Sequence, residues 1–152
     1  MVINIRRSRP DEGDKLIAIW CRSVDATHDF LSKAYRRELE ELVRAFIPEA
    51  PLWVAVNTED QPIAFMLLTG DHMDALFVDP DVRGCGVGKL LIEHALSLTP
   101  KLTTNVNEQN EQAVGFYQKM GFRVTGRSET DDLGQPYPLL NLMYEQQAEA
   151  DY

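Results

Sequence analysis

A glycine-dense turn between an apolar segment and a helical pattern is the feature that most constrains how this 152-residue chain can fold. The apolar segment covers residues 75–78 and ends at an Asp-Pro pair, which breaks regular structure. Gly84, Gly86 and Gly88 follow at alternate positions, so one side of the turn has no Cβ atoms and its N–H groups can surround an anion. A helix that begins directly afterwards points its positive dipole end at the same place. The stretch therefore predicts a strand–turn–helix unit that binds a phosphate.

Strand-like and helix-like patterns alternate along the rest of the chain. Apolar residues at helical spacing predict four helices: one that Pro10 begins and the segment 25–31 interrupts, one that Ser32 caps, one marked by apolar residues from Val87 to Leu98 and ending at Thr99-Pro100, and one that Asn110 caps. Apolar or β-branched runs predict about seven strands, at residues 2–6, 52–56, 63–68, 73–78, 102–106, 122–125 and 139–144. The elements follow one another in the order strand, two helices, three strands, helix, strand, helix and two strands. This order predicts an α/β protein with one mixed sheet and helices on both of its faces.

The ends of two helices are also predicted by their residue types. The second helix is expected to stop at Pro48, and the fourth at Gly121, a residue type that favours the C-terminal cap. The second helix is expected to bury one apolar face, formed by Tyr35, Leu39, Leu42 and Phe46.

The chain shows neither an internal repeat nor a linker, so residues 1–144 are expected to form one domain and 145–152 a polar tail. No apolar run approaches the roughly 20 residues that span a bilayer, and the first residues do not form a signal peptide. Two cysteines, Cys21 and Cys85, lack the spacing of a disulfide framework or a metal site. A cytoplasmic location without a bound metal is therefore expected. The oligomeric state cannot be inferred from the sequence.

The formal net charge of −9 argues against nucleic acid and anionic membranes as partners, and it suits a cationic substrate better. Two common nucleotide loops are also excluded. A Walker loop requires a glycine where Arg83 stands and a hydroxyl residue where Leu90 stands. A dinucleotide-binding fingerprint requires a different glycine spacing after an early strand.

Two motifs instead resemble those of the GCN5-related N-acetyltransferases, the GNAT family. Residues 83–88, with the sequence RGCGVG, fit the pattern Q/R-x-x-G-x-G/A, in which the family binds the pyrophosphate of an acyl-coenzyme A. Residues 110–122 resemble the second signature of the family, N-x-x-A-x-x-F-Y-x-K-x-G-F. The element order matches along nearly the whole chain. The resemblance implies a GNAT fold with a mostly antiparallel sheet.

The resemblance implies that acetyl-coenzyme A is the donor. The N–H groups from about Val82 to Lys89 are expected to hold its pyrophosphate, and the strand before the loop is expected to pair with the pantetheine arm. Asn110 would hydrogen-bond the same arm. The donor-binding residues expected from the resemblance are Leu76, Phe77, Val78, Arg83, Gly84, Cys85, Gly86, Val87, Gly88, Lys89, Asn110, Ala113 and Phe116.

Tyr117 matches the tyrosine that serves the family as a general acid, and Phe116 beside it is expected to face the core. A tyrosine that merely packs within its helix is the alternative. His72 stands where histone-type members carry a glutamate base, and the intrinsic pKa of a histidine side chain suits proton removal. Asp74 shares a strand face with His72 and could hold its ring. A structural histidine, with water as the proton acceptor, is the alternative.

The acceptor site is expected around His28 and Phe30, in a loop that borders it across the family, together with Asp74 and Asn105. Asn105 replaces the glutamate of another branch and cannot act as a base, but it could orient the acceptor. We expect direct transfer of the acetyl group to a primary amine, of a protein lysine, a protein N-terminus or a small molecule. A catalytically silent acetyl-coenzyme A sensor is the alternative.

Overall fold

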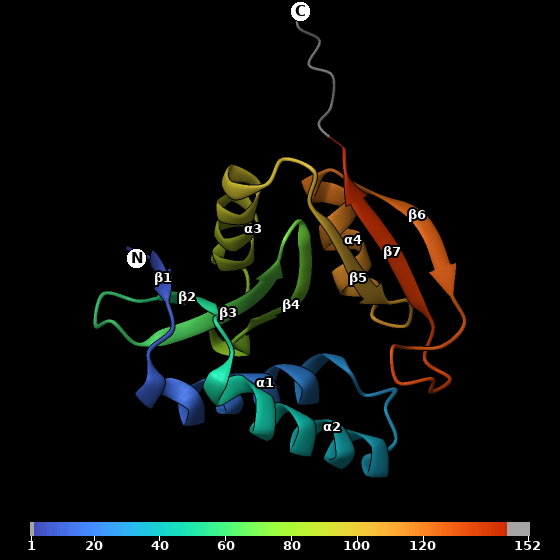
Figure 1. The fold of residues 1–152 in the computed structure, drawn as a ribbon, viewed down its shortest axis with the longest axis horizontal. Helices are drawn as coiled ribbons and strands as arrows, with labels where there is room; N and C mark the ends of the chain where they lie inside the picture. The colour runs from blue at the N-terminus through green and yellow to red at the C-terminus, as the bar shows by residue number, and fades with distance from the viewer. Residues whose placement is uncertain (1, 146–152) are drawn as a thin grey trace, which may run out of the picture. The chain divides into compact units, whose positions relative to one another are not determined.

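The computed structural model describes residues 2–145, so most of the predicted polar tail lies outside the described residues. Seven strands form one sheet in the order β1-β2-β3-β4-β5-β7-β6 (Figure 1). β4 and β5 pair in parallel, whereas the pairs β1–β2, β2–β3, β5–β7 and β6–β7 are antiparallel. The strands are β1 (Asn4–Arg7), β2 (Trp53–Val56), β3 (Pro62–Thr69), β4 (His72–Val78), β5 (Thr103–Asn107), β6 (Phe122–Ser128) and β7 (Leu139–Tyr144).

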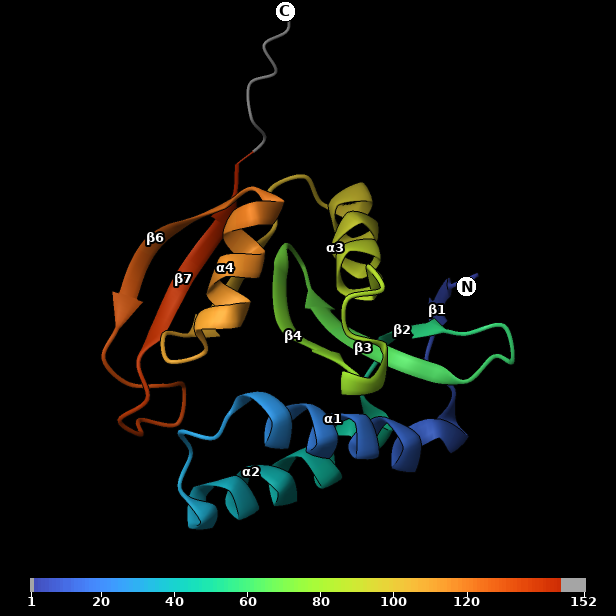
Figure 2. The same ribbon diagram turned by 180° about the vertical axis from the view of Figure 1, so that it is seen from behind.

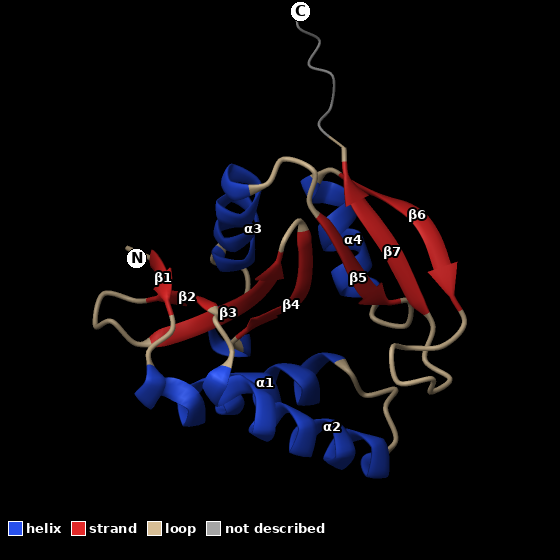
Figure 3. Ribbon diagram, viewed as in Figure 1, coloured by secondary structure: helices blue, strands red, loops and turns tan. Residues whose placement is uncertain are grey.

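Within the described residues there are also four α-helices, two between β1 and β2, one between β4 and β5 and one between β5 and β6. Figure 3 separates helices from strands by colour. They are α1 (Gly13–Thr27), α2 (Lys33–Phe46), α3 (Val87–Leu98) and α4 (Glu111–Met120), with short 3₁₀ turns η1 (Pro10–Glu12), η2 (Ile47–Glu49) and η3 (Pro80–Val82). The predicted α/β fold class, with its mixed and mostly antiparallel sheet, is confirmed. None of the helices within residues 2–145 is long and apolar enough to cross a membrane.

The chain separates into two compact units, which we describe one at a time. Within the described residues, the first unit comprises residues 2–68 and Ala75–His94, and the second comprises Thr69–Asp74 and residues 95–145. Strand β4 contributes its first residues to the second unit and its last residues to the first.

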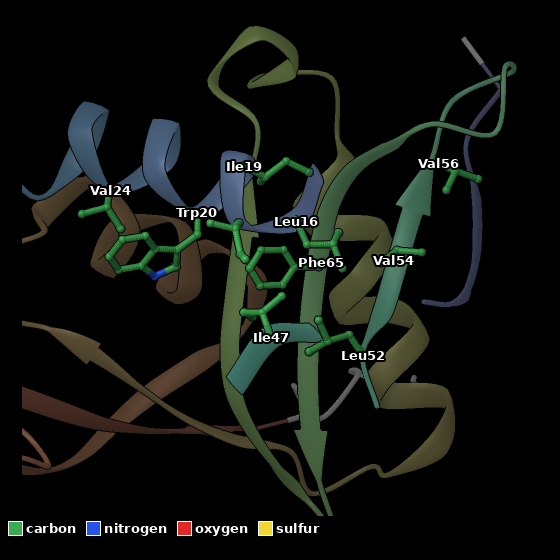
Figure 4. Close-up of a cluster of buried hydrophobic side chains, with 10 residues drawn as sticks. Leu16, Ile19, Trp20, Val24, Ile47, Leu52, Val54, Val56 and Phe65 are labelled. Carbon is green, nitrogen blue, oxygen red and sulfur yellow. The ribbon is translucent and has the colours of Figure 1, made fainter. Parts of the chain in front are cut away.

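The core of the first unit lies between α1 and the strands β2 and β3. Alternation along β2 decides which side chains join it, because Val54 faces α1 whereas the ring of Trp53 contacts that of His94 on α3, with 4.3 Å between centroids. Helices thus cover both faces of this part of the sheet. The buried cluster drawn in Figure 4 includes Leu16, Ile19, Trp20, Val24, Ile47, Leu52, Val54, Val56 and Phe65.

Helix α2 begins as predicted, with the Ser32 hydroxyl accepting a hydrogen bond from the Tyr35 backbone N–H at 3.1 Å. The predicted apolar face is partly wrong, because Leu42 and Phe46 are 50% and 52% exposed. Residues spaced by four turn inward instead, namely Tyr35, Leu39, Val43 and Ile47. Ile47 belongs to the turn η2, where the chain leaves the helix at Pro48, and it occupies the core position expected for Phe46.

In the second unit, α4 covers one face of the strands β5, β7 and β6 (Figure 2). Thr104, Val106 and Leu142 are buried, since they alternate with the more exposed residues of their strands. Asn110 caps α4 as predicted. Gly121 ends it in the left-handed conformation, with φ of 109°, also as predicted.

Candidate active site

An ion pair anchors the start of the loop that follows β4. Asp79 caps the turn η3 by accepting the N–H of Asp81 at 3.1 Å, and it pairs with Arg22 of α1 at 2.6 Å. Burial alone would raise the pKa of Asp79, but the hydrogen bond from Arg22 lowers it below its ordinary value. The carboxylate is therefore charged, and it fixes the beginning of the glycine turn against α1.

The glycine turn requires glycine at two positions for its backbone conformation. Gly84 and Gly86 have φ of 88° and 80°, in the region that side chains with a Cβ disfavour. A Cβ on either residue would meet no atom within 4 Å, so the constraint comes from the backbone angle and not from crowding. Gly88 already belongs to α3.

Several backbone N–H groups of this turn remain open. Those of Val82, Arg83 and Cys85 donate to carbonyl groups within the turn, at 3.0, 3.3 and 3.2 Å. The first hydrogen bond into α3 runs from the N–H of Leu90 to the carbonyl of Gly86 at 3.1 Å. Among the residues described, no backbone acceptor pairs with the N–H groups of Gly84, Gly86, Val87, Gly88 and Lys89.

These open donors fit a pyrophosphate. They stand at the N-terminus of a 12-residue helix and in a turn whose surface is exposed, so a phosphate oxygen can approach the backbone closely. Fewer N–H groups are therefore open to a pyrophosphate than the expected range from Val82 to Lys89, because the first residues of that range use their N–H groups inside the turn.

Strand β4 presents its residues to two sides. Phe77 packs toward the core, with 6.4 Å between its ring centroid and that of Trp20 and 5.6 Å to that of Phe65. The ladder between β4 and β5 consists of the pairs His72–Thr103 and Met73–Thr104. The segment predicted to bind the pantetheine arm, residues 76–78, lies beyond that ladder and is half-buried.

His72 and Asp74 lie on the same face of β4, as alternation predicted. The His72 Nε2 atom is 3.7 Å from Asp74 Oδ1, and His72 Nδ1 is 2.8 Å from the hydroxyl of Thr103 on β5. The other carboxylate oxygen of Asp74 accepts a hydrogen bond from the Thr69 hydroxyl. The imidazole is thus held by a hydrogen bond at Nδ1, and its Nε2 atom lies near the Asp74 carboxylate without a hydrogen bond to it.

Helix α4 places its two adjacent aromatic residues opposite to the prediction. Tyr117 is 7% exposed, whereas Phe116 is half-buried, so Tyr117 and not Phe116 enters the core. Its ring lies 5.4 Å from that of Phe116 and 5.5 Å from that of Phe122, measured between centroids. Burial raises the pKa of the Tyr117 phenol, because the charged phenolate would lose its hydration. At neutral pH the hydroxyl therefore carries its proton.

Asn110 is engaged by its own helix, since its side-chain oxygen accepts the N–H of Ala113 at 3.2 Å. Its amide NH₂ group is a separate donor, so capping leaves it able to bind a carbonyl group.

The residues predicted for the acceptor occur in separate pairs. His28 and Phe30, after α1, are in ring contact at 5.3 Å, and His28 Nδ1 is 2.6 Å from the Thr27 hydroxyl. His72 and Asp74 form the second pair.

In the third pair, Asn105 of β5 donates a hydrogen bond to the side chain of Asn141, its register partner on β7. Asn141 in turn lies beside Gly126, where a Cβ would come within 3.3 Å of its amide nitrogen.

Three neighbours of these residues were missed at the sequence level: Thr103, Asn141 and Arg22. The first two become visible only through strand register, which pairs Thr103 with His72 and Asn141 with Asn105. Arg22 belongs to a helix whose charged side chains carry no motif. Within the described part of the chain, no group of three or more His, Cys, Asp or Glu side chains could hold a metal ion.

Comparison with known proteins agrees with the two motifs and the fold. The acetyltransferase (GNAT) domain family matches residues 18–136. The chain is 78% identical over 144 residues to the peptidyl-lysine N-acetyltransferase YjaB of Escherichia coli K12, which covers 95% of this chain and 98% of that protein.

Solved structures extend the likeness to three dimensions. The solution structure of the apo form of YjaB from Escherichia coli superposes with a TM-score of 0.92, at 78% identity over 95% of this chain and 98% of that one. The PaiA N-acetyltransferase of Thermoplasma acidophilum, solved with coenzyme A, shares the fold at 19% identity and a TM-score of 0.74 over 95% and 99% of the two chains. The chain therefore belongs to the GNAT acetyltransferase family and is an acetyl-coenzyme A-dependent N-acetyltransferase.

Proposed function

We propose that this enzyme acetylates the side-chain amine of lysine residues in polypeptides. The observation that carries the proposal is the 78% identity, over nearly the full length of both chains, to a protein named for that activity. The net charge of −9 supports it, because a lysine-bearing acceptor is cationic. Protein N-termini and small amines are the competing acceptors.

The donor is bound by the glycine turn and by β4. The open N–H groups of Gly84 and Gly86 and of the first residues of α3 would hold the pyrophosphate through charge-assisted hydrogen bonds, worth roughly 1.5–3 kcal/mol each. Acetyl-coenzyme A supplies an activated thioester when bound. Backbone N–H groups of residues 76–78 would bind its arm and polarise its carbonyl, and the Asn110 amide would donate to the same arm.

Tyr117 is assigned as the general acid. Burial keeps its phenol protonated, which is the state from which an acid must start. The hydroxyl donates its proton to the sulfur as the carbon–sulfur bond breaks. Exchange with solvent then restores the phenol.

His72 is assigned as the base. A lysine amine with a pKa of about 10.4 is mostly protonated at pH 7, so exposing its lone pair costs about 4–5 kcal/mol at about 1.4 kcal/mol per pH unit. The imidazole takes the proton that the amine nitrogen loses when it bonds to the acetyl carbon. Asp74, at 3.7 Å, stabilises the resulting imidazolium.

His28, Phe30, Asn105 and Asp74 are assigned to the acceptor. The rings of His28 and Phe30, which are in contact and tilted by 44° to each other, offer aromatic faces to the aliphatic stem of a lysine. Asn105 keeps a carbonyl oxygen that can accept a hydrogen bond, since its amide nitrogen is the group that binds Asn141.

We further place the reaction in the cytoplasm, where the free thiols of Cys21 and Cys85 would stay reduced.

The test compares Tyr117→Phe with Tyr144→Phe, a matched change on the half-buried tyrosine that contacts Phe122 from β7. Release of coenzyme A thiol is followed with acetyl-coenzyme A and a lysine peptide. We expect Tyr117→Phe to lower kcat about 100- to 1,000-fold with little change in donor KM, and Tyr144→Phe to stay near wild type. Full turnover by Tyr117→Phe would contradict the assignment of Tyr117 as general acid. Acetylation of small amines but of no peptide would contradict the assignment of polypeptide lysine as the acceptor.

A further inference from the structure

We propose that Thr103 is a positioning residue that sets the tautomer of His72, so that Nδ1 carries the proton of the neutral ring and Nε2 accepts the proton of the amine. The inference rests on the proposed role of His72 as base. It adds which nitrogen atom reacts and which side chain decides this.

The Thr103 hydroxyl has one proton and two neighbours that could accept it. Its Oγ1 atom lies 2.8 Å from His72 Nδ1 and 3.3 Å from the backbone carbonyl oxygen of Asp71. A carbonyl oxygen only accepts, so the Asp71 contact is a hydrogen bond only when the hydroxyl points its proton there. His72 Nδ1 must then be the donor to Oγ1.

The opposite arrangement makes fewer hydrogen bonds. If Thr103 donated to Nδ1, the Asp71 contact would be lost, and the proton would move to Nε2. At 3.7 Å, Asp74 Oδ1 is too far from Nε2 to accept a hydrogen bond. The assigned tautomer therefore makes two hydrogen bonds where the alternative makes one. The difference in hydrogen bonds therefore determines the direction of donation, from His72 Nδ1 to Thr103 Oγ1 and from Thr103 Oγ1 to the Asp71 carbonyl oxygen.

The backbone holds this chain of hydrogen bonds in place. His72 and Thr103 are register partners in the parallel β4–β5 ladder, so their side chains stand next to each other. The Thr103 N–H also donates to the Asp71 carbonyl, at 2.9 Å. Threonine is β-branched, and its restricted χ1 keeps the hydroxyl in one direction.

The free Nε2 atom then lies on the side of the ring where the Asp74 carboxylate stands. One Asp74 oxygen is 3.7 Å from Nε2, and the other accepts the Thr69 hydroxyl, which fixes the carboxylate. In the reaction a proton leaves the amine nitrogen and binds the Nε2 lone pair, while Nδ1 keeps its own proton. The positive charge gained by the ring is balanced by Asp74, and the proton later passes to water.

Nitrogen NMR of the imidazole ring tests the tautomer directly, without turnover. The ¹⁵N shifts and one-bond couplings of His72 are measured at alkaline pH, where an imidazole is neutral, in wild type, Thr103→Val and Thr103→Ser. We expect Nδ1–H in wild type and in Thr103→Ser, which keeps the hydroxyl. We expect a shift toward Nε2–H, the form that predominates in free histidine, in Thr103→Val, which keeps the shape but lacks the hydroxyl. Nε2–H in the wild type would overturn the proposal.

Kinetics test the consequence for the proposed base. We expect Thr103→Val to lower kcat/KM for the lysine peptide about 10-fold and Thr103→Ser to recover most of the loss. In a His72→Ala background, Thr103→Val should cause no further loss, because the two residues act together. An equal 10-fold loss in that background would mean that Thr103 is only structural. If His72→Ala leaves kcat/KM unchanged, the base assignment fails, while the NMR result still decides the tautomer.

Discussion

The phenol of Tyr117 shows how burial of a single group connects packing to chemistry. It lies among Phe116 and Phe122, where solvent cannot stabilise a phenolate, and its pKa is raised for that reason. The same burial that keeps the proposed acid protonated also makes the folded state sensitive to alkali. A free tyrosine of the unfolded chain loses its proton at a pH of about 10, below the pKa of the buried one.

The wild-type enzyme should therefore lose stability relative to Tyr117→Phe as pH rises above about 10. The folded pKa is the higher one, so the stabilisation is complete below the unfolded pKa and is lost as pH rises toward the folded pKa. At pH 11 the free energy of unfolding of wild type should have fallen by about 1 kcal/mol more than that of Tyr117→Phe. Urea unfolding at pH 8 and pH 11 measures this difference, and the other tyrosines cancel in the comparison. A difference that does not change with pH would contradict the assigned burial.

At the scale of elements, α4 depends on two glycines with opposite requirements, Gly115 within the helix and Gly121 at its C-terminal cap. Gly121 ends the helix with φ of 109°, and a Cβ there would lie 3.0 Å from the Tyr144 ring. Gly115 lies within the helix, and a Cβ there would meet nothing within 4 Å. The first position therefore needs glycine, whereas the second carries only the conformational cost of glycine in a helix.

Gly121→Ala should destabilise the protein by about 1–2 kcal/mol, and Gly115→Ala should stabilise it by about 0.5–1 kcal/mol. The strained left-handed backbone and the close Tyr144 ring act together in the first case, and helix propensity acts alone in the second. Thermal and urea unfolding of the two variants give the signs. Destabilisation of equal size in both variants would show that the end of α4 is not held as the structure describes.

Local signals predicted the helix α3, the caps at Ser32 and Asn110, and the end of α4 at Gly121. Each depends on residues within one turn of the feature. The inward face of α2 could not be predicted in this way. Apolar residues occur at two adjacent spacings there, and only tertiary packing selects Val43 and Ile47 over Leu42 and Phe46.

The residues of the candidate site likewise fall into those that local sequence predicts and those that depend on tertiary structure. The glycine turn and the α4 signature follow from local sequence, and so does the shared face of His72 and Asp74. Thr103 and Asn141 depend on which strands pair and in which register, which a single sequence does not specify. Adjacent Phe116 and Tyr117 differ by one helical step, so the sequence alone could not show which of them is buried.

At the scale of the whole molecule, the net charge of −9 favours the approach of cationic partners over anionic ones. The donor is an anion, and the open N–H groups of the glycine turn offer it local partners that do not depend on net charge. The residues assigned to the acceptor offer no comparable set of open backbone N–H groups, and they include the carboxylate of Asp74. Long-range attraction should therefore matter more for the acceptor.

Two peptides with the same central lysine, one flanked by arginines and one by glutamates, separate this effect from donor binding. At saturating acetyl-coenzyme A and low salt, we expect kcat/KM to be about 10-fold higher for the arginine-flanked peptide, because steering by the field of a protein can change encounter rates at least that much. Raising ionic strength from about 0.01 M to 0.15 M shortens the screening length from about 30 to 8 Å, so the two values should converge. Loss of steering predicts that the first value falls and the second rises, a pattern that general salt effects on the enzyme do not produce. A preference that persists unchanged at high salt would assign selectivity to direct contacts with groups such as Asp74, and not to the net charge.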